Sequence, residues 1–420
     1  MRIGVNCFLL QANIGGLKQY FLTLFRELLE HDGENEYILF WYAHNADELA
    51  KLGTDRWKNN AILLQDQRDV VSHLDRLDLY FCPFNVLYPR PLSKPTVMTL
   101  VDIQEVYYPE FFTPEDLYNR QLHYPVSTRM ADRVITISEF SKQALVRHHR
   151  LLPDKVIVAH LCADERYYRS DQIARPPAQT LPQDFILYPA NFWKHKNHDR
   201  LLQALRLLRE EKGLAVSAVF TGFDEPNGYP LSAKVKEYGL DSQVSVLGYV
   251  TIEEMAYLYR QARMLVFPSL FEGFGIPLVE AMAAGCPIVA ANATSIPEIA
   301  ADACELFDPT SPRATAEAIT KVWYDGTLRQ EMIARGKRRA QNFSPERTAQ
   351  AHRTAFAEAV NAYSYARFLW NRWVYGYYHQ ARLEFRWHKR FRAKLVHKLK
   401  ASYGMRRMFG RMKSWESDQG

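Results

Sequence analysis

Short runs of consecutive apolar residues alternate along the chain with segments in which apolar residues recur every three or four positions. Residues 3–9 form the first run, and residues 17–29 follow with the i, i+3, i+4, i+7 spacing of an amphipathic helix. Runs that are apolar throughout are typical of strands covered on both faces, as in parallel sheets. Further strands of the first half are predicted at residues 37–42, 61–64, 79–82, 97–101, 134–137 and 156–159.

The alternation begins again after a polar, proline-rich stretch at residues 174–182, which we interpret as an interdomain linker. Helices are predicted at residues 199–211 and 252–262. Strands that alternate with helices predict a doubly wound parallel sheet in each half, with ligands bound at the carboxyl ends of the strands. Five strands are predicted here, at residues 185–189, 216–221, 244–247, 264–267 and 287–290.

A chain of 420 residues is too long for one ordinary core and suits two domains. We expect an N-terminal Rossmann-like domain at residues 1–170 and a second one at residues 183–345. A helix that begins near Pro345 is predicted to close the body over residues 346–362, and a tail follows at residues 363–420.

The tail, residues 363–420, is basic and rich in aromatic residues, whereas the rest of the chain is slightly acidic although the net charge is +6. Aromatic and basic residues together suit the boundary between water and anionic lipid, and we expect a helix on a membrane surface. The alternatives are a helix folded back on the protein and, with least weight, a nucleic-acid-binding extension. Helical spacing is seen in Trp370, Trp373, Val374, Tyr377 and Ala381, and again in Trp387, Phe391, Leu395 and Leu399.

No targeting signal is predicted at the N-terminus, and the longest apolar run, residues 264–271, is interrupted by Pro268. A membrane span needs ~20 apolar residues, so none is expected. The five cysteines lie far apart and show neither metal-ligand nor redox spacing, which favours a reducing compartment. We therefore expect a cytoplasmic protein, with the tail as a means of peripheral attachment to the inner face of the membrane.

Two glutamates separated by seven residues mark the strongest candidate site. Glu272 lies in a glycine-rich loop after a predicted strand, and Glu280 lies in the following helix, whose first turn contains Pro277. Two helical turns bring the second carboxylate towards the side of the first. The backbone of Gly273 and Gly275 can approach a ligand closely, so the site suits a phosphate held by amides and hydroxyls held by carboxylates. The alternative is an acidic loop followed by an ordinary surface glutamate.

Residues 267–282 resemble the E-x7-E motif of retaining glycosyltransferases of the GT-B type, in particular family 4. The resemblance continues through residues 281–290 and 295–299 and covers roughly residues 1–360. It implies an α/β fold of two Rossmann-like domains that face each other across a cleft, with the tail as a helical extension. By this resemblance the acceptor side is at residues 1–170 and the nucleotide-sugar donor side is at residues 183–345. It also implies that Glu280 binds the ribose hydroxyls, that Glu272 lies near the donor sugar, and that the backbone of Phe274 and Gly275 touches sugar or phosphate.

A second candidate segment, residues 188–198, follows a predicted strand and opens a helix. A pyrophosphate needs a cation as well as a helix N-terminus. Lys196 resembles the family lysine that neutralises the donor pyrophosphate. Many relatives have an arginine a few residues earlier, where this chain has Asn191, and Lys194 is the candidate supplement. The alternative is a solvated helix start with two exposed lysines.

Glycines at strand ends supply weaker candidates. Gly15 and Gly16 join the first predicted strand to the first helix, where backbone amides can face an anion. In relatives this loop closes over the donor phosphates, although any strand-to-helix turn can contain glycine. The resemblance further places Thr221 and Gly222 near phosphate and Val250 near the nucleobase.

The chain departs from the family after the strand at residues 97–100, where many relatives have His-Asp and this chain has Val101 and Asp102. An isopropyl group forms no hydrogen bond to a sugar hydroxyl. The retaining mechanism usually proposed needs no side-chain nucleophile, because the leaving phosphate takes the acceptor proton. Asp102 orients the acceptor or caps a turn, and Ser138, in a further family-like segment at residues 131–141, reads equally well as a helix N-cap.

The predicted function is retaining transfer of a hexosyl unit, GDP-mannose being favoured over UDP-hexoses as donor, to a glycan or lipid-linked acceptor of a surface polysaccharide. The predicted catalytic residues are Glu272, Asp102 and Lys196. We expect neither cofactor nor metal, because the sequence has no Asp-x-Asp motif and a lysine with helix dipoles can replace the ion. The alternatives are a sugar-nucleotide epimerase and a catalytically weak nucleotide-sugar-binding subunit. A glycogen-type phosphorylase would need a much longer chain.

Overall fold

The computed structural model describes residues 1–11, 15–223 and 228–374. The chain divides into two compact units, Met1–Tyr363 and Ser364–Gly420. The second unit is described only as far as residue 374, and residues 365–374 are helical. The predicted helix positions at Tyr377, Ala381, Trp387, Phe391, Leu395 and Leu399 lie outside the described residues. In the described ranges no helix is long and apolar enough to cross a membrane.

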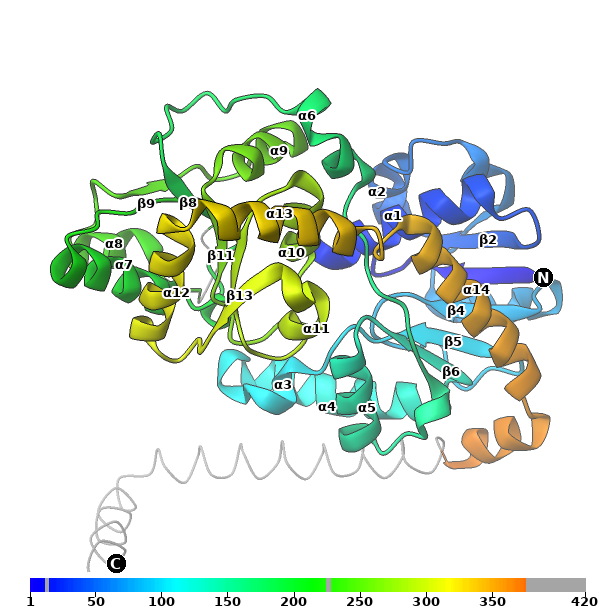
Figure 1. Ribbon diagram of the computed structural model, residues 1–420. Coiled ribbons are helices and arrows are strands. Elements are labelled where there is room, and N and C mark those ends of the chain that lie inside the picture. Colours follow the sequence, from blue (N-terminus) through cyan, green and yellow to red (C-terminus); the bar gives the residue numbers. More distant parts are fainter. Residues whose placement is uncertain (12–14, 224–227, 375–420) are drawn as a thin grey trace, which may run out of the picture. The chain divides into compact units, whose positions relative to one another are not determined.

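The first half of the chain forms a parallel sheet of seven strands in the order β3-β2-β1-β4-β5-β6-β7 (Figure 1). All seven predicted strands are confirmed. In the register, Val5 of β1 is paired with Leu39 of β2 and with Phe81 of β4, and all three side chains are buried. The strands are β1 (Arg2–Asn6), β2 (Glu36–Trp41), β3 (Ala61–Leu63), β4 (Leu79–Cys82), β5 (Thr96–Thr99), β6 (Arg133–Thr136) and β7 (Val156–Val158).

The second half forms a parallel sheet of six strands, and the prediction of five was therefore incomplete. The missed strand, β13 (Cys304–Phe307), lies at the edge of the sheet, and three of its four residues are only partly buried. An edge strand is covered less fully, so its sequence lacks the continuous apolar run that marks the others. The order is β10-β9-β8-β11-β12-β13, with β8 (Phe185–Pro189), β9 (Ser217–Thr221), β10 (Val244–Val246), β11 (Met264–Phe267) and β12 (Ile288–Ala291).

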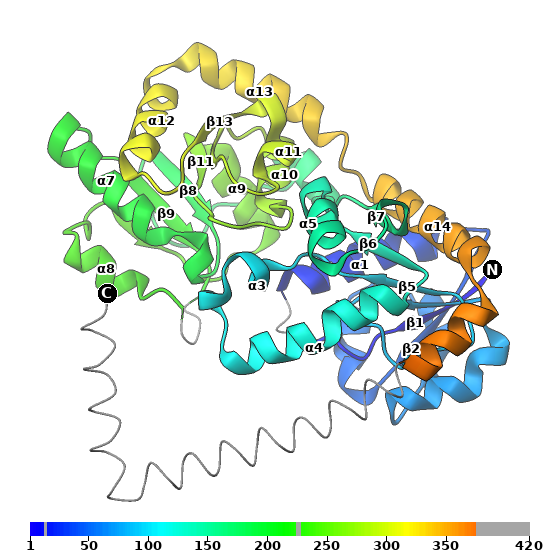
Figure 2. The same cartoon turned by 90° about the horizontal axis from the view of Figure 1, so that it is seen from below.

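Helices connect successive strands and cover the sheets (Figures 1 and 2). The predicted helices at residues 17–29, 199–211 and 252–262 are confirmed as α1, α7 and α9. In the first half the helices are α1 (Gly15–His31), α2 (Ala46–Ala50), α3 (Gln104–Tyr107), α4 (Pro114–Met130), α5 (Glu139–His149) and α6 (Ser170–Ile173). In the second half they are α7 (His198–Lys212), α8 (Leu231–Glu237), α9 (Ile252–Gln261), α10 (Ile276–Ala284), α11 (Ile296–Ala300), α12 (Pro312–Tyr324), α13 (Gly326–Ala340) and α14 (Pro345–Ala362).

The last helix, α14, begins at the predicted residue and returns to the first sheet, where it packs against α1 and strands β4 to β7 (Figure 2). Its buried His352 is hydrogen-bonded through Nε2 to the hydroxyl of Tyr20 at 2.7 Å. Burial lowers the pKa of His352 to about 4, so the ring is neutral at pH 7. The chain thus crosses between the two sheets twice, once near residues 170–184 and once before Pro345.

Candidate functional site

The strand order of the second sheet reverses between β8 and β11. In open parallel sheets, ligands bind outside the carboxyl ends of the strands at such a reversal, because the two following loops diverge there and leave a crevice. The loop after β8 carries Asn191, Lys194 and Lys196, and the loop after β11 carries Glu272 and Gly273. The fold therefore places these five predicted site residues around one point of the sheet.

At this point Lys196 and Glu272 form an ion pair, with 2.7 Å between Nζ and Oε1. Their side chains are only 19% and 11% exposed, so the pair is screened little by water. Lys196 belongs to a short 3-10 turn, Lys194–Lys196, whose last carbonyl accepts a hydrogen bond from the hydroxyl of Tyr188 at 2.7 Å. The structure thus brings together two of the three predicted catalytic residues.

Asn197 connects the lysine turn to the loop after β11. It adopts a left-handed conformation, with φ of 61°, at the start of α7. Its buried amide nitrogen Nδ2 donates to the carbonyl oxygens of Pro268 at 2.9 Å and Pro309 at 2.8 Å. Because asparagine tolerates the left-handed region and carries two amide donors, one residue both turns the chain and fixes the loop.

The glycine-rich loop before α10 is held by hydroxyl groups. The Ser295 hydroxyl lies 2.9 Å from the carbonyl oxygen of Glu272 and 3.1 Å from that of Phe274, and the Ser138 hydroxyl donates to the carbonyl of Gly273 at 2.7 Å. Ser138 is also the N-cap of α5, as one of the two readings predicted. Its bond to Gly273 ties the loop of the second sheet to a helix of the first.

Three backbone amides of the same loop, in residues that are buried, have no hydrogen-bond partner in the described part of the chain. Among the described residues, none accepts a hydrogen bond from the amide groups of Gly273, Phe274 or Gly275. Gly275, with φ of 95°, precedes α10, and Pro277 occupies the first turn as predicted. Three unused N–H groups beside a helix N-terminus favour an anion.

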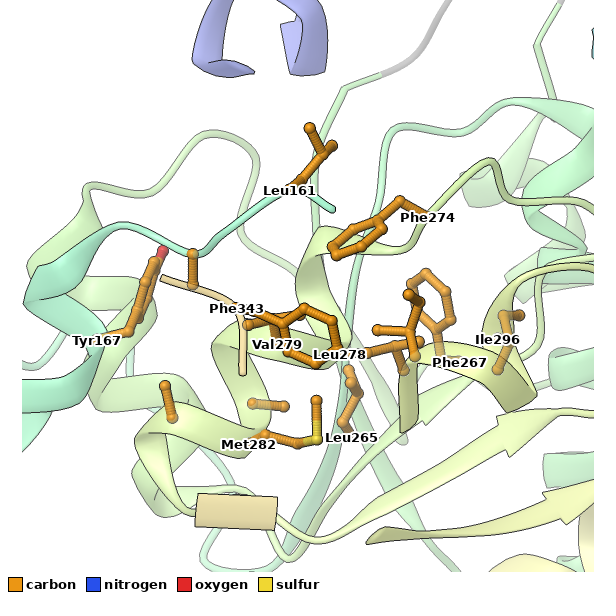
Figure 3. Packing of buried hydrophobic residues seen from close by; sticks show 14 of the residues in the cluster. Leu161, Tyr167, Leu265, Phe267, Phe274, Leu278, Val279, Met282, Ile296 and Phe343 are labelled. Atoms are coloured by element: carbon orange, nitrogen blue, oxygen red, sulfur yellow. The ribbon is translucent and has the colours of Figure 1, made fainter. Parts of the chain in front are cut away.

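The loop rests on an apolar core. Phe274 is 2% exposed, and its ring meets that of Phe343 edge to face, with 5.6 Å between centroids. Figure 3 shows these rings beside Leu278 and Val279 of α10. The side chain of Phe274 therefore belongs to the core, and a role of its backbone in ligand binding stays a prediction.

Asp102 packs against the loop from the first sheet. A Cβ atom at Gly273 would lie 2.7 Å from Oδ2 of Asp102, so only glycine fits. Oδ1 of Asp102 accepts a hydrogen bond from the amide of Gln104 at 3.1 Å. Asp102 therefore caps a turn, which is one of the two roles that the sequence analysis gave it. Burial raises the pKa of Asp102, and the charge of Glu272 adds to the effect.

Val101 has no polar side chain to offer a ligand, and its main-chain groups already form hydrogen bonds within the first sheet. Its carbonyl oxygen accepts a hydrogen bond from the hydroxyl of Thr136 at 3.2 Å, and its amide donates to Oδ1 of Asn85 at 3.2 Å. The carbonyl oxygen of Val101, at the position where many relatives have a histidine, therefore already accepts one hydrogen bond within the first sheet.

Glu280 is hydrogen-bonded to a tyrosine rather than to Lys196 or Glu272. The hydroxyl of Tyr259, on α9, donates to Oε2 of Glu280 at 2.8 Å. Burial raises the pKa of Glu280 to about 7, and the charge of Asp164 acts in the same direction. The sequence analysis missed both Tyr259 and Asp164, which become neighbours of Glu280 only through tertiary packing.

The remaining predicted residues occupy strand ends. Gly15, with φ of 48°, and Gly16 begin α1 and are exposed. Lys194 is exposed, and Asn191 Oδ1 accepts the amide of Phe223 at 3.3 Å. Thr221 ends β9 and is buried, Val250 follows β10, and a Cβ atom at Gly222 would lie 2.5 Å from the carbonyl oxygen of Ala190.

Glu298, also missed as a functional residue, joins the two sheets. Its carboxylate accepts the amides of Glu139 at 2.9 Å and Phe140 at 3.0 Å, at the start of α5, and lies 2.8 Å from Nε2 of His160. Burial opposes ionisation, but His160 and the two amides outweigh it and lower the pKa of Glu298. Glu298 lies in the family-like segment at residues 295–299, so the sequence could have singled it out. The spacing of residues along the chain does not predict which distant groups its carboxylate contacts.

Among the described residues, no group of three or more His, Cys, Asp or Glu side chains has the geometry to hold a metal ion. The charges gathered at the reversal of the second sheet are those of Lys196, Glu272 and Asp102. Together with the three unused amides they can neutralise and orient an anionic ligand.

His198, the first residue of α7, is buried directly behind the lysine turn. Within residues 1–11, 15–223 and 228–374, neither ring nitrogen has a hydrogen-bond partner. The ring lies against Tyr188, Phe192 and Tyr229, with centroids 4.8, 5.2 and 6.0 Å away. Burial, with the charge of Lys196, lowers the pKa of His198 to about 3. The site is thus backed by a neutral ring that behaves as an aromatic residue.

We expect His198→Phe to make the protein less sensitive to acid. The unfolded chain, whose histidine has a pKa of about 6.5, takes up a proton before the folded chain does, so stability is lost as pH falls from about 6.5 towards 3. Between pH 7 and pH 5 the loss from this group is about 2 kcal/mol. Urea unfolding at the two pH values measures it. The exposed His148→Phe is the control, and an unchanged pH 7 to pH 5 difference in His198→Phe would contradict the prediction.

Known proteins resemble this chain in sequence and in fold. Residues 170–339 match the sequence profile of the family Glycosyl transferases group 1. The O-antigen chain mannosyltransferase B of Escherichia coli is 30% identical over 310 residues, which are 72% of this chain and 78% of that protein. The O-antigen chain mannosyltransferase RfbU of Salmonella typhimurium is 27% identical over 46% of this chain and 51% of its own length.

Solved structures of low sequence identity share the fold. A glycosyltransferase from Rickettsia africae, 14% identical, matches with a TM-score of 0.64 over 86% of this chain and 98% of its own. HepE of Anabaena in complex with UDP, 18% identical, matches with a TM-score of 0.63 over 85% and 99%. Two Rossmann-like parallel sheets of this kind make the GT-B fold, as expected. The chain therefore belongs to the group 1 glycosyl transferases and is a glycosyltransferase.

Proposed function

We propose that this protein transfers a mannosyl unit, with retention and without a metal, from a nucleotide diphosphate sugar to a glycan or lipid-linked acceptor of a surface polysaccharide. The observation that carries the proposal is the ion pair of Lys196 and Glu272 beside the three unused amides of the glycine-rich loop. GDP-mannose is the favoured donor, because the relatives described above are named mannosyltransferases. UDP-hexoses are the second choice, since the fold neighbour HepE is in complex with UDP.

In this proposal the charge that develops on the departing phosphate is stabilised by Lys196 and by the amides of Gly273 to Gly275. The positive end of α10 acts in the same direction. The incoming diphosphate competes with Glu272 for the ammonium group, which frees the carboxylate of Glu272 to receive hydroxyl groups of the sugar. The leaving phosphate takes the acceptor proton, so no side chain serves as nucleophile.

Glu280 is assigned to the ribose of the donor, where its carboxylate accepts hydrogen bonds from two hydroxyl groups. Such hydrogen bonds favour the ionised form, whereas without ligand the pKa is about 7. Binding of the donor is then linked to loss of a proton from Glu280.

We therefore expect donor affinity to weaken as pH falls, by about tenfold between pH 8 and pH 6, because the ionised fraction of a group with a pKa near 7 falls by that factor. The diphosphate diester keeps a constant charge over this range. Titration calorimetry with GDP-mannose measures the affinity. Tyr259→Phe removes the hydrogen bond that lowers this pKa and should move the transition to higher pH; an affinity independent of pH would contradict the assignment.

The donor itself can be identified by ligand-observed NMR with a panel of UDP-, GDP- and ADP-sugars. We expect saturation of the ribose and sugar protons of one nucleotide and its loss in Glu280→Ala and Lys196→Ala. If the folded protein bound no sugar nucleotide, the proposed transfer would be wrong.

A nucleotide-sugar-binding subunit with little turnover is the second candidate. It is favoured by Val101, which has no polar side chain at the position where many relatives have a histidine. This reading predicts donor binding with negligible transfer and negligible donor hydrolysis, and the same NMR panel combined with an activity assay separates it from the first.

We further propose a cytoplasmic location with peripheral attachment to anionic membrane through residues 363–420. In the described part of this segment Tyr365, Trp370 and Trp373 are 60%, 62% and 65% exposed, and Arg367 and Arg372 lie among them. Exposed tryptophans beside basic residues suit the lipid boundary. Liposome flotation of the full chain against a version that ends at Asn361 tests this, and equal flotation of both would exclude attachment through the tail.

A further inference from the structure

The three unused amides of the glycine-rich loop each share a peptide group with a carbonyl that is hydrogen-bonded. A peptide group is planar, and in its trans form the carbonyl and the N–H point in opposite directions. A partner that holds the carbonyl therefore also sets the direction of the amide. The peptide bonds of the loop are trans. Each unused amide is thus directed by the group that holds the carbonyl of the residue before it.

The two outer amides are directed by Ser295. Its hydroxyl lies 2.9 Å from the carbonyl oxygen of Glu272 and 3.1 Å from that of Phe274, so its one proton is shared between two acceptors. These carbonyls belong to the peptide groups that carry the amides of Gly273 and Gly275. Ser295 is buried and immediately precedes α11, in the same half of the chain as the loop. The outer amides are therefore directed from within the second half.

The middle amide, that of Phe274, is directed from the first half. Oγ of Ser138 lies 2.7 Å from the carbonyl oxygen of Gly273, and a carbonyl can only accept, so the hydroxyl proton points to it. The lone pairs of the same oxygen face the amide of Ser141 at 3.1 Å and the hydroxyl of that residue at 3.0 Å. Both serines are at most 1% exposed. A buried hydroxyl with all its positions used cannot turn freely, so the Phe274 amide keeps one direction while α5 stays in place.

Glu298 holds the start of α5. The first amides of a helix have no partner inside it, and a negative charge is favoured at this end. Here the carboxylate of Glu298, from α11, accepts hydrogen bonds from the amides of Glu139 at 2.9 Å and Phe140 at 3.0 Å. It also lies 2.8 Å from Nε2 of His160, whose ring centroid is 6.0 Å from that of Phe274. A side chain of the second half thus supplies two hydrogen bonds that α5 cannot make by itself.

These contacts close a ring that runs through both halves of the chain. Ser295 binds the loop and leads into α11, whose Glu298 binds the start of α5, and the N-cap of α5, Ser138, returns to the loop. The second half by itself can direct two of the three amides. The direction of the third depends on contact with the first half.

From this ring of contacts we infer that Ser138 and Glu298 are positioning residues of the transfer reaction. Glu298 fixes the start of α5, Ser138 fixes the direction of the Phe274 amide, and the anion-binding loop is complete only while the two halves are in contact. This assignment rests on the proposed function, in which the amides stabilise charge on the departing phosphate. A donor held by the second half alone would meet an incomplete set of amides, which disfavours its hydrolysis before the halves meet.

Steady-state kinetics of the full chain with two serine variants tests the role of Ser138. Ser138→Ala and Ser311→Ala each remove a helix N-cap, because the Ser311 hydroxyl accepts the amide of Ala314 at 3.1 Å at the start of α12. Ser138 additionally holds the loop. We expect kcat to fall by about 10- to 100-fold in Ser138→Ala and by less than about twofold in Ser311→Ala, because the Phe274 amide is still present but no longer directed. The KM for the donor should change by less than about threefold in both variants, since the charge on the phosphate grows in the transition state. Ser138→Thr keeps the hydroxyl and should restore kcat to within about fivefold of the wild type.

Glu298→Gln tests the second positioning residue. It keeps the size of the side chain but places an NH₂ group where one of the two backbone amides needs an acceptor. We expect kcat to fall by about 5- to 20-fold, and we expect no further loss when Ser138→Ala is added, because Glu298 acts through Ser138. Glu305→Gln is the matched control, since its ion pair with Lys321, with 2.8 Å between the charged atoms, lies within the second half.

The amide of Phe274 can be followed directly by NMR after isotope labelling of the phenylalanine amides, with Phe274→Leu to assign its signal. On addition of GDP, and separately of UDP, we expect a downfield shift of this amide proton in the wild type and in Ser311→Ala. The shift should be reduced by at least about half in Ser138→Ala and in Glu298→Gln, because a misdirected N–H forms a poorer hydrogen bond to phosphate.

Equal kcat in Ser138→Ala and Ser311→Ala, losses that multiply in the double variant, or the same Phe274 shift in all variants would overturn the inference and leave the proposed transfer intact. If Ser138→Ala fails to fold, Glu298→Gln against Glu305→Gln decides the question by the same readouts. Wild-type protein that binds no sugar nucleotide would overturn the proposed function and this inference with it.

Discussion

Replacing Lys196 with alanine should lower kcat of sugar transfer by about 100- to 1,000-fold, the range seen when one preorganised group that stabilises a developing oxyanion is removed. The ammonium group is held at the glycine-rich loop by its 2.7 Å bond to Glu272, and both side chains are largely buried. A rate assay with saturating donor and acceptor measures the effect. Lys194→Ala is the matched control, because its side chain is exposed two residues away, and its kcat should change by less than about threefold.

Loss of the ion pair also leaves Glu272 partly buried without its partner, and this structural effect must be separated from the catalytic one. The double variant Lys196→Met with Glu272→Gln removes both charges and should recover the thermal stability that Lys196→Ala loses. Its activity should stay low. If the double variant regained transfer activity, Lys196 would be a structural residue and the proposed mechanism would be wrong.

Gly273→Ala should lower activity by about 100-fold and stability by about 1–3 kcal/mol, because the added methyl group would lie 2.7 Å from Oδ2 of Asp102. The loop that carries the three unused amides must move to relieve this contact. Thermal unfolding and the rate assay measure the two effects. Gly33→Ala is the control, since a Cβ atom there meets nothing within 4 Å.

A second substitution shows whether the contact with Asp102 is the cause. Asp102→Ala removes the carboxylate that the new methyl group would meet, so the double variant should be more stable than Gly273→Ala alone, with a coupling of about 1 kcal/mol or more. Purely additive losses would place the strain elsewhere. A Gly273→Ala protein of normal stability and normal rate would contradict the packing of the loop against the first sheet.

Most of the fold could be predicted from local pattern. Each buried strand of a parallel sheet is a short apolar run, and each amphipathic helix repeats its apolar positions every three or four residues. Twelve of the thirteen strands were found in this way, and β13 was missed because an edge strand is only half covered. The starts of α10 and α14 could also be predicted from local sequence, because proline in the first turn marks a helix start.

The site was predicted only in part: the sequence analysis named residues of the site but not the contacts between them. Glu272, Gly273 and Lys196 stood out because of loop composition and a resemblance to known motifs. Their neighbours Ser138, Ser295 and Tyr259 did not, since a hydroxyl group that holds a loop looks like any other in a sequence. A cavity at the ends of β1 and β4 was not predicted, because its lining residues Phe8, Asp66 and His123 come from three separate segments of the chain.

By itself the sequence determined the two sheets, the order of their strands and helices along the chain, and the loops at which charged residues and glycines gather, because these depend on periodicity over a few residues. Only the tertiary structure decided that Lys196 pairs with Glu272 across 76 positions, that Ser138 reaches Gly273 across 135, and that α14 returns to the first sheet so that His352 meets Tyr20. Such contacts depend on how strands are ordered within a sheet and on which loops then come to lie together. Burial raises the pKa of Glu280 and of Asp102 by the same route, since the solvation of a carboxyl group depends on its neighbours in space.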